Sequence, residues 1–153
     1  MTVHIYQGEK FNRTHENQGF DALCRQLISY WGESDEHIVL IGNVNVEGNE
    51  LDALLLKPDA VAVIDFKNYG GKLSIAENGP WSADGDLVRG GAAMSPFVQI
   101  RQNKFALMNW LTRCLPDLKA SNNLGHIAGL VLFQQPIDVD ESQLPPKVRS
   151  WFK

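Results

Sequence analysis

Residues Glu50–Lys67, with the sequence ELDALLLKPDAVAVIDFK, form two apolar runs joined at a Pro-Asp pair. The runs Leu51–Leu56 and Val61–Phe66 are rich in branched aliphatic side chains, which favour β-strands. Pro followed by Asp favours a tight reversal of the chain between them. The stretch therefore predicts an antiparallel β-hairpin around which the rest of the chain is organised.

The charged residues of this hairpin lie within or at the end of its apolar runs, where a charged side chain is unfavourable. Asp65 and Lys67 share one face of the second strand, because successive side chains of a strand point to opposite faces. That face also carries Val61 and Val63, and the opposite face carries Ala62, Ile64 and Phe66. Asp52 interrupts the apolar run of the first strand, so we expect it at a sheet surface or in a cleft rather than in a dry core.

Two carboxylates on neighbouring strands suggest a metal site. Two carboxylates held close together raise each other's pKa unless a cation lies between them. Asp52 and Asp65 would suit a hard ion such as Mg²⁺, which takes one or two protein carboxylates and leaves room for a substrate phosphate. Lys67 could orient or help to deprotonate an attacking water, or neutralise charge that develops on the phosphorane. A strand that ends in Asp-x-Lys can also be a solvated edge with an ion pair, so the triplet alone leaves both interpretations open.

The stretch His15–Trp31 has the pattern of an amphipathic helix. Its apolar residues recur at spacings of three and four, and they are Phe20, Leu23, Leu27, Ile28 and Trp31. Glu16 precedes Phe20 by four residues and therefore lies on the packing face, where its carboxylate could reach the metal or its waters. An acidic group in the first turn is also favoured by the helix dipole, so helix capping is the alternative role for Glu16.

A second long helix is expected to start at Ser95-Pro96, since Ser is a preferred N-cap and Pro is tolerated at the first helical position. Its expected buried stripe, which ends before Pro116, consists of Val98, Phe105, Met108, Leu111 and Leu115. Hydrogen-bond donors crowd its first two turns: Gln99, Arg101, Gln102, Asn103 and Lys104. With the free N–H groups of the helix start they could bind a phosphate backbone, although a solvated helix face explains Arg101 and Lys104 equally well.

The remaining segments predict further strands and a loop. Strands are expected at His37–Val44, at Lys72–Ile75 and at His126–Gln134. His126–Gln134 is almost continuously apolar, which predicts an inner strand. Trp81 can be a core residue or a base-stacking platform. The Gly-rich stretch 83–94 predicts a loop in which Arg89 is a candidate phosphate contact, and Lys72 is another.

A helix, strands with a central hairpin, a second helix and a further strand together predict an α/β domain. Its central mixed β-sheet would be flanked by α-helices, with Asp52, Asp65 and Lys67 at one sheet edge. The length of 153 residues suits one domain, and 44% hydrophobic residues suffice for a core. The formal net charge is −4, so the chain should bind nucleic acid weakly by itself unless positive charge is local or another segment delivers the substrate.

Several functional classes are excluded or disfavoured by what the sequence lacks. It has no apolar run of about 18 or more residues and no basic leader followed by an apolar stretch, so we expect neither a membrane span nor a signal peptide. Cys24 and Cys114 are isolated, which is typical of ordinary buried cysteines in a cytoplasmic protein and argues against zinc. No GxxxxGK[ST] or GxGxxG loop is present, which disfavours a nucleotide phosphotransfer enzyme.

The chain resembles the NERD family, the nuclease-related domain of the PD-(D/E)XK nuclease superfamily. The resemblance runs through His15–Phe20, Asn49–Asp52, Val63–Asn68, the Gly70-Gly71 hairpin to Trp81, Ser95–Gln99 and Gly125–Phe133. By that similarity Asp52 matches the first motif Asp of the superfamily, and Asp65 with Lys67 matches its (D/E)-x-K. The family commonly has Glu where this chain has Asp65, which shortens the reach but keeps the ligand chemistry. Ser95 stands where an Asn often precedes the Pro, a departure that affects loop detail.

The resemblance implies a restriction-endonuclease-like core that hydrolyses phosphodiester bonds, with DNA as the substrate and Mg²⁺ or Mn²⁺ as the cofactor. The metal ligands that we expect are Asp52, Asp65, Glu16 and the backbone carbonyl of Phe66. Lys67 would position the nucleophile, and Gln99 would fix Lys67 or the scissile phosphate. The residues expected to bind nucleic acid are Arg89, Arg101, Lys104 and Lys72.

A rival hypothesis is a non-catalytic nucleic-acid-binding or scaffolding module that keeps the nuclease fold. The intact set of Asp52, Asp65 and Lys67 counts against it, because an inactive descendant has no chemical reason to retain all three. For the domain organisation we expect a lead-in at residues 1–14 and the nuclease-like domain at 15–136. Residues 137–153 would lead into a further domain of a longer protein, and the resemblance implies a helicase or kinase-like partner there.

Overall fold

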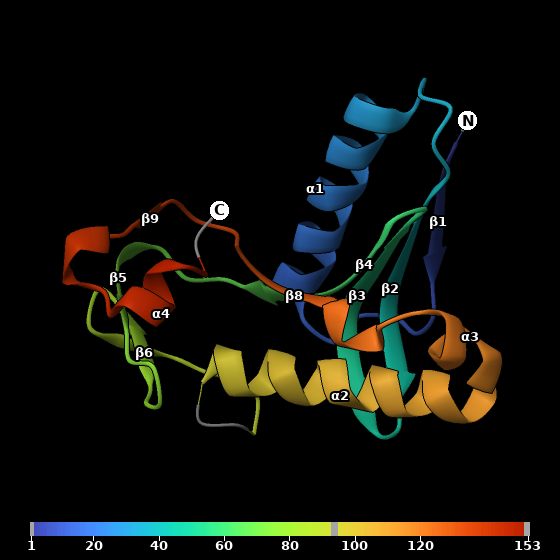
Figure 1. Cartoon of the computed structure of the whole chain (residues 1–153). Coiled ribbons are helices and arrows are strands. Elements are labelled where there is room, and N and C mark those ends of the chain that lie inside the picture. Colours follow the sequence, from blue (N-terminus) through green and yellow to red (C-terminus); the bar gives the residue numbers. More distant parts are fainter. Residues whose placement is uncertain (1, 93–94, 152–153) are drawn as a thin grey trace.

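The computed structural model describes residues 2–92 and 95–151, and a five-stranded sheet forms its main body (Figure 1). Its strands are β1 (Val3–Gln7), β2 (Ile38–Val46), β3 (Asn49–Lys57), β4 (Ala60–Lys67) and β8 (Ala128–Phe133), in the spatial order β1-β2-β3-β4-β8. The pairs β2–β3 and β3–β4 are antiparallel, whereas β1–β2 and β4–β8 are parallel. This arrangement confirms the predicted central mixed sheet and makes β3 and β4 the predicted hairpin.

Two long helices, α1 (Thr14–Trp31) and α2 (Pro96–Cys114), cover opposite faces of this sheet. α1 shares a buried cluster with Ile64 and Phe66 of β4, while α2 shares a different cluster with Val63. Because neighbouring residues of β4 belong to different clusters, the alternation of faces along this strand is confirmed. The layers are therefore helix, sheet and helix, in agreement with the α/β architecture.

The start of α2 is as predicted, and its buried stripe is predicted only in part, because Met108 and Leu111 pack against the cluster beneath the helix. The hydroxyl oxygen of Ser95 accepts a hydrogen bond of 3.3 Å from the backbone N–H of Val98, and Pro96 occupies the first turn. Phe105 and Leu115 are exposed, which contradicts the expected stripe. The residues that α2 buries are Pro96, Ile100, Asn103, Ala106 and Leu107. Two overlapping apolar stripes were available on this helix, and helical spacing alone does not specify which one meets the sheet.

A second, four-stranded mixed sheet forms a small lobe beside the main body (Figure 1). Its strands are β5 (Gly71–Ile75), β6 (Trp81–Ala83), β7 (Asp86–Val88) and β9 (Ile137–Asp138), in the order β7-β6-β5-β9. The stretch 83–94, expected as a loop, therefore contains part of a β-hairpin. Its turn places Asp84 and Gly85 at positive φ, which Gly and Asp adopt more readily than most residues. Residues 93–94 of that stretch lie outside the described part of the chain.

The small lobe has an aromatic core of its own. Trp81 is buried, which confirms its predicted structural role, and its ring lies 6.2 Å from that of Trp151. Trp151 stacks in turn on Phe97 at a centroid distance of 4.5 Å. Val148 of the short helix α4 (Pro146–Arg149) is also buried here. Because Phe97 lies in the first turn of α2, this helix packs against both the lobe and the main sheet.

The remaining elements are α3 (Pro116–Ser121) and the 3₁₀ turns η1 (Leu124–His126) and η2 (Glu141–Gln143). None of the helices among residues 2–92 and 95–151 is both long enough and apolar enough to cross a membrane.

Three further expectations differ from the structure. Residues Val3–Gln7, which we placed in a lead-in before the domain, form the edge strand β1 and extend the main sheet. The strand predicted as an inner one, β8, lies at the opposite edge, so its apolar run does not reflect burial on both sides. The cysteines are not ordinary buried ones, because Cys114 is exposed at the end of α2 and Cys24 is half-buried. An apolar composition cannot distinguish a strand buried in its own fold from one left at an open edge.

Candidate active site

The predicted site residues converge where β3 and β4 separate. The two strands pair from Lys57 opposite Ala60 to Ala53 opposite Ile64, and the ladder stops there. Beyond this point β3 remains paired with β2, and β4 remains paired with β8. Asp52 and Asp65 are the next residues on the two strands. The strands thus open between two carboxylates and release backbone groups from the ladder at that level.

Asp52 occupies the opening itself. Its Oδ2 accepts a hydrogen bond of 2.8 Å from the backbone N–H of Phe66, a donor that the interrupted ladder has left free. Burial, followed by the charge of Asp65, raises the pKa of Asp52 to about 8, and the hydrogen bond from Phe66 only partly opposes these two effects. Near neutral pH this carboxyl group therefore holds a proton unless a cation displaces it.

Asp65, Lys67 and Gln99 form a chain of contacts from β4 to α2. Asp65 and Lys67 are both buried, and Asp65 Oδ2 lies 2.9 Å from Lys67 Nζ. Lys67 Nζ donates a hydrogen bond of 2.9 Å to Gln99 Oε1. Gln99 reaches this position because Ser95 caps α2 one turn earlier, and the N–H of Gln99 bonds to the carbonyl of Ser95. The ammonium group is thus held between a carboxylate and an amide oxygen.

One oxygen of the site is left without a hydrogen bond. Asp65 Oδ2 touches Lys67 Nζ outside hydrogen-bonding geometry, and within the described part of the chain it is buried with no hydrogen-bond partner. The Lys67 ammonium offsets the charge of this carboxylate, but its Oδ2 accepts no hydrogen bond, which is costly for a buried oxygen. Carboxylate and carbonyl oxygens are the ligands that Mg²⁺ and Mn²⁺ prefer. The donor set formed by Asp52, Asp65 and the carbonyl of Phe66 therefore fits a hard divalent cation.

Glu16 lies near this pair without completing a cluster of three. Its charge contributes to the raised pKa of Asp52, after burial and the charge of Asp65, so it faces the same opening from the first turn of α1. Across residues 2–92 and 95–151, no three His, Cys, Asp or Glu side chains are gathered closely enough to hold a metal. Arg13 Nε lies 4.0 Å from Glu16 Oε1, so the exposed Arg13 side chain forms an ion pair with Glu16. Among the described residues Glu16 is therefore not gathered with Asp52 and Asp65 into a set of three ligands.

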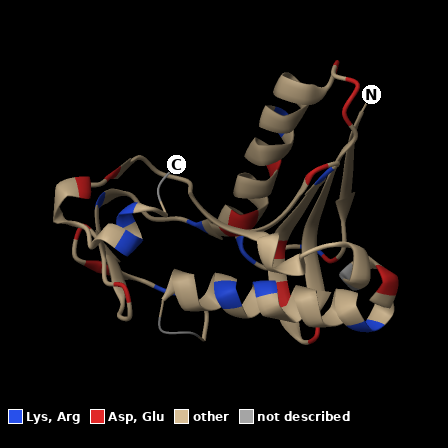
Figure 2. Ribbon diagram, in the orientation of Figure 1, with Lys and Arg blue, Asp and Glu red and all other residues tan. Residues whose placement is uncertain are grey.

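The residues expected to bind nucleic acid do not gather in one patch. Arg101 and Lys104 lie on α2, where the guanidinium of Arg101 covers the ring of Phe105 and Lys104 Nζ donates to the carbonyl of Gly125 at 2.8 Å. Lys72, in contrast, belongs to β5 of the small lobe, and Arg89 follows β7. Figure 2 shows Lys and Arg distributed over α2 and the lobe among acidic residues. Only Arg101 and Lys104 are therefore close neighbours.

Sequence reasoning missed Asn43 of β2. Asn43 stands opposite Asp52 in the register, between the pairs Gly42–Ala53 and Val44–Leu51, but it does not pair with Asp52. It is buried with a positive φ of 49°, and its amide donates to the carbonyls of Glu9 and Lys10 at 3.2 and 3.0 Å. Asn is among the few residues that accept this conformation, so Gly-Asn inside an apolar run was the available signal.

β3 is irregular at the same level as Asn43, because neither Asn43 nor Asp52 is paired in the register of β2 and β3. Leu51 and Leu54 both belong to the cluster beneath α2, although strict alternation would place them on opposite faces. The strand therefore rotates between them, at Ala53 and Asp52. This rotation explains why the Asp52 carboxylate reaches the backbone of β4 instead of pointing straight away from the sheet.

Gln134 is a second residue that sequence reasoning missed. Its backbone N–H donates to the carbonyl of Lys67 at 2.9 Å, and its side-chain Nε2 donates to the carbonyl of His15 at 2.6 Å. The contact requires Gly19, because a Cβ there would lie 2.7 Å from Gln134 Nε2. Gln134 thus ties the strand end that carries Lys67 to the helical turn that carries Glu16. A Gln after an apolar strand gives no sequence signal for this role.

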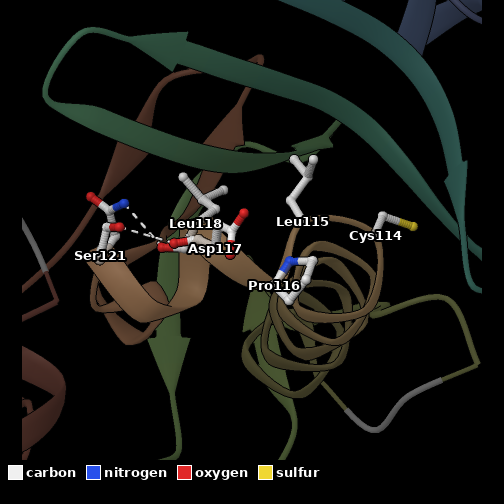
Figure 3. A pocket seen from close by; sticks show the side chains of 7 residues that line it. Cys114, Leu115, Pro116, Asp117, Leu118 and Ser121 are labelled. Atoms are coloured by element: carbon white, nitrogen blue, oxygen red, sulfur yellow. Dashed lines mark hydrogen bonds between the residues drawn. The ribbon is translucent and has the colours of Figure 1, made fainter.

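A hollow of about 480 Å³ at the junction of α2 and α3 is not part of this site (Figure 3). None of the predicted site residues lines it. Its polar side chains form hydrogen bonds with backbone carbonyls of α3. Ser121 Oγ donates to the carbonyl of Asp117, and Asn122 Nδ2 donates to the carbonyl of Leu118.

Comparison with protein families identifies the chain. The family model described as NERD, the nuclease-related domain, matches residues 13–134. The match begins one residue before α1 and ends one residue after β8, so it contains the two helices, the hairpin and both carboxylates described above. Comparisons with curated proteins and with solved structures gave no significant match. Because the match covers most of the 153 residues, the chain belongs to the NERD family of nuclease-related domains.

Proposed function

We propose that this domain is a metal-dependent nuclease that hydrolyses phosphodiester bonds, with DNA as its substrate. The observation that carries the proposal is the pair of adjoining carboxylates, Asp52 and Asp65, at the strand opening beside Lys67. Asp65 and Lys67 alone would balance as an ion pair, whereas a second carboxylate held against Asp65 leaves a surplus of negative charge that a divalent cation can neutralise. Membership of a nuclease-related family supports the same reaction class.

Asp52 and Asp65 would hold Mg²⁺ or Mn²⁺ together with the carbonyl of Phe66, and waters would complete the shell. Such an ion takes one or two protein carboxylates and keeps several waters, which suits a site where the described residues supply no third acidic ligand. When bound, the ion polarises a phosphoryl oxygen and lowers the pKa of a water. Glu16 would accept a hydrogen bond from one of the metal's waters.

Lys67 would act on the reacting groups. Gln99 Oε1 and Asp65 hold its ammonium group at the opening, so the side chain is oriented before a substrate arrives. From there it can hold the attacking water by a hydrogen bond and offset the negative charge that develops at the phosphorus centre. Gln99 is then a positioning residue that acts through Lys67.

The substrate contacts outside the site are part of the same proposal. Arg101 and Lys104 on α2 are suited to phosphate groups, although Lys104 would have to release the carbonyl of Gly125 to reach one. With a formal net charge of −4 the domain should bind DNA weakly alone. We therefore propose delivery of DNA by a further, helicase-type domain in the same polypeptide.

The test is cleavage of linear, circular and single-stranded DNA in the presence of Mg²⁺ or Mn²⁺, with EDTA as the metal-free control. We expect metal-dependent cleavage, and Lys67→Met should reduce its rate by about a hundredfold or more. Lys57→Met is the matched control, because Lys57 lies at the other end of the same hairpin and should be dispensable. Cleavage that survives EDTA, or that Lys67→Met leaves unchanged, would contradict the proposal.

A non-catalytic binding or scaffolding module is the second candidate, and one observation favours it. The charges of Asp65 and Lys67 already lie 2.9 Å apart and balance each other without a metal. This function predicts that neither Mg²⁺ nor Mn²⁺ changes the melting temperature of the domain and that no DNA is cleaved. Metal binding without cleavage would instead indicate a nuclease that lacks its delivery domain.

A further inference from the structure

The edge of the main sheet formed by β8 is apolar and open. Within the described residues β8 pairs on one side only, with β4. Its sequence AGLVLF contains no charge and no proline, and its first three residues are exposed. Sheet edges are usually protected by Lys, Pro, bulges or a covering element, because their free N–H and C=O groups pair readily with another strand. Along its six residues β8 has no Lys, no Pro and no bulge.

A groove of about 900 Å³ follows this edge. All residues of Ala128–Phe133 line it in succession. Alternate side chains of a strand point to opposite faces, so a groove touched by every residue runs along the strand edge and not over one face. One wall is α2, with Phe105 46% exposed, and Leu130 of the floor is 38% exposed. The other wall is the small lobe, through Ile137 and Val139.

The groove has a charge opposite to that of the chain. Among the described residues that line it there are two cations, Arg101 and Lys104, and no carboxylate. The chain as a whole carries 18 Asp and Glu against 14 Lys and Arg. Lys104 is bonded to the carbonyl of Gly125, whereas the exposed guanidinium of Arg101 is free to meet an anion. An occupant should therefore combine apolar side chains with at least one carboxylate.

We propose that β8 accepts an extended segment of a partner protein as an additional strand of the main sheet. The segment would bond to the free backbone groups of β8, place alternate apolar side chains in the groove and set an Asp or Glu against Arg101. Strand addition of this kind draws its affinity from main-chain hydrogen bonds and its specificity from the alternate side chains. The groove shares Arg101 and Lys104 with the proposed DNA contacts, but Asp52, Asp65 and Lys67 do not line it, so strand addition does not require nuclease activity.

Two other occupants fit the groove less well. Single-stranded nucleic acid would need free aromatic faces for its bases, but Trp81, Trp151 and Phe97 stack on one another and Arg101 already covers Phe105. A second copy of this chain, paired edge to edge through β8, would bring two grooves of the same charge together.

The experiment is selection from a displayed library of ten-residue peptides with the domain immobilised. We expect enrichment of sequences with alternating apolar residues and a flanking Asp or Glu. Leu130→Lys should weaken the binding of selected peptides about tenfold or more, since it puts a charge on the apolar edge. Arg101→Glu should reverse the charge preference from acidic to basic peptides. Leu87→Lys, at an exposed leucine of β7 that does not line the groove, is the matched control and should leave binding unchanged.

Three outcomes would overturn the proposal. The first is the absence of any enriched pattern, and the second is enrichment that survives Leu130→Lys while circular dichroism shows that the variant is folded. The third is a dimer in light scattering that Leu130→Lys dissociates, which would assign the edge to a second copy of the chain. Methylation of alternate backbone nitrogens in a selected peptide should abolish its binding, because strand addition requires those N–H groups.

Discussion

The β3–β4 hairpin carries an Asp–Lys pair at each end, and the two pairs differ in every physical respect except sequence spacing. At the turn, Lys57 Nζ lies 3.7 Å from Asp59 Oδ1, and the side chains are 27% and 81% exposed. At the open end, Lys67 Nζ lies 2.9 Å from Asp65 Oδ2, and the side chains are 11% and 4% exposed. An exposed pair of this kind contributes about 0–1 kcal/mol, whereas a buried one is costly to form and costly to break. The comparison indicates that burial, and not the spacing of Asp and Lys in the sequence, distinguishes the pair at the proposed site from a surface pair.

The largest expected effect is on stability and comes from removing one member of each pair. Lys67→Met should lower the free energy of unfolding by about 3–5 kcal/mol, because it leaves the Asp65 carboxylate buried without its cation. Lys57→Met should change it by less than about 1 kcal/mol. Urea unfolding at pH 7 measures both. The double variant Asp65→Asn/Lys67→Met should recover much of the loss, and equal effects of the two single substitutions would contradict the comparison.

A somewhat smaller effect should follow from adding metal. Mg²⁺ or Mn²⁺ at about 100 times its dissociation constant should stabilise the folded domain by about 2.7 kcal/mol and raise its melting temperature. Asp65→Ala should abolish this shift, because it removes a proposed ligand, whereas Asp59→Ala at the exposed end should preserve it. Thermal unfolding with and without metal measures the difference. A shift that Asp65→Ala leaves intact would place the cation elsewhere.

The raised pKa of Asp52 predicts a pH dependence. Its folded-state pKa of about 8 exceeds the ordinary value of 3.8, so the folded domain binds the extra proton between these limits. Stability without metal should therefore be greatest at the low end of this range and fall as the pH rises through about 8. Asp52→Asn should be more stable than the parent at pH 9, and by a smaller margin at pH 5, as measured by chemical unfolding. If Asp52 instead stabilised the folded domain more strongly at higher pH, the sign of this pKa shift would be wrong.

The same proton predicts the pH dependence of metal binding. A cation that coordinates Asp52 must displace the proton below about pH 8, so the apparent affinity should fall about tenfold for each pH unit below that value. Calorimetric titration in buffers with different ionisation enthalpies would measure the released proton. Binding of the cation without proton release at pH 6.5 would show that Asp52 is not a ligand.

The smallest expected effect compares two adjacent glutamines. Gln134→Ala should cost about 1 kcal/mol, since it removes the half-buried bond to the carbonyl of His15 that links α1 to the strand of the site. Gln135→Ala removes only an exposed bond to Asn68 and should cost less than about 0.5 kcal/mol. Gln134→Ala should also lower the cleavage rate through the displacement of Glu16. Equal rates for the two variants would remove Gln134 from the positioning of the site.

Much of the fold followed from local patterns. The hairpin, the extent of α1 and the start of α2 were predicted from β-propensity, helical spacing and capping chemistry, and the structure confirms them. The shared face of Asp65 and Lys67 followed from the alternation of side chains on a strand. These features depend on residues that are close together in the chain, so their spacing can be read directly from the sequence.

Other features needed the tertiary structure because they depend on which distant elements become neighbours. The choice of the buried stripe on α2, the edge position of β8 and the bond of Gln134 to His15 are set by packing between segments far apart in the chain. The same holds for Asn43, which has a left-handed backbone conformation and lies opposite Asp52 where the pairing of β2 and β3 is interrupted. This pairing cannot be read from the sequence. The sequence by itself identified Asp52, Asp65 and Lys67 as candidate site residues. Only the tertiary structure decided that Asp65 and Lys67 are buried and that Asp52 and Asp65 adjoin, because desolvation and through-space contact arise only when the layers pack.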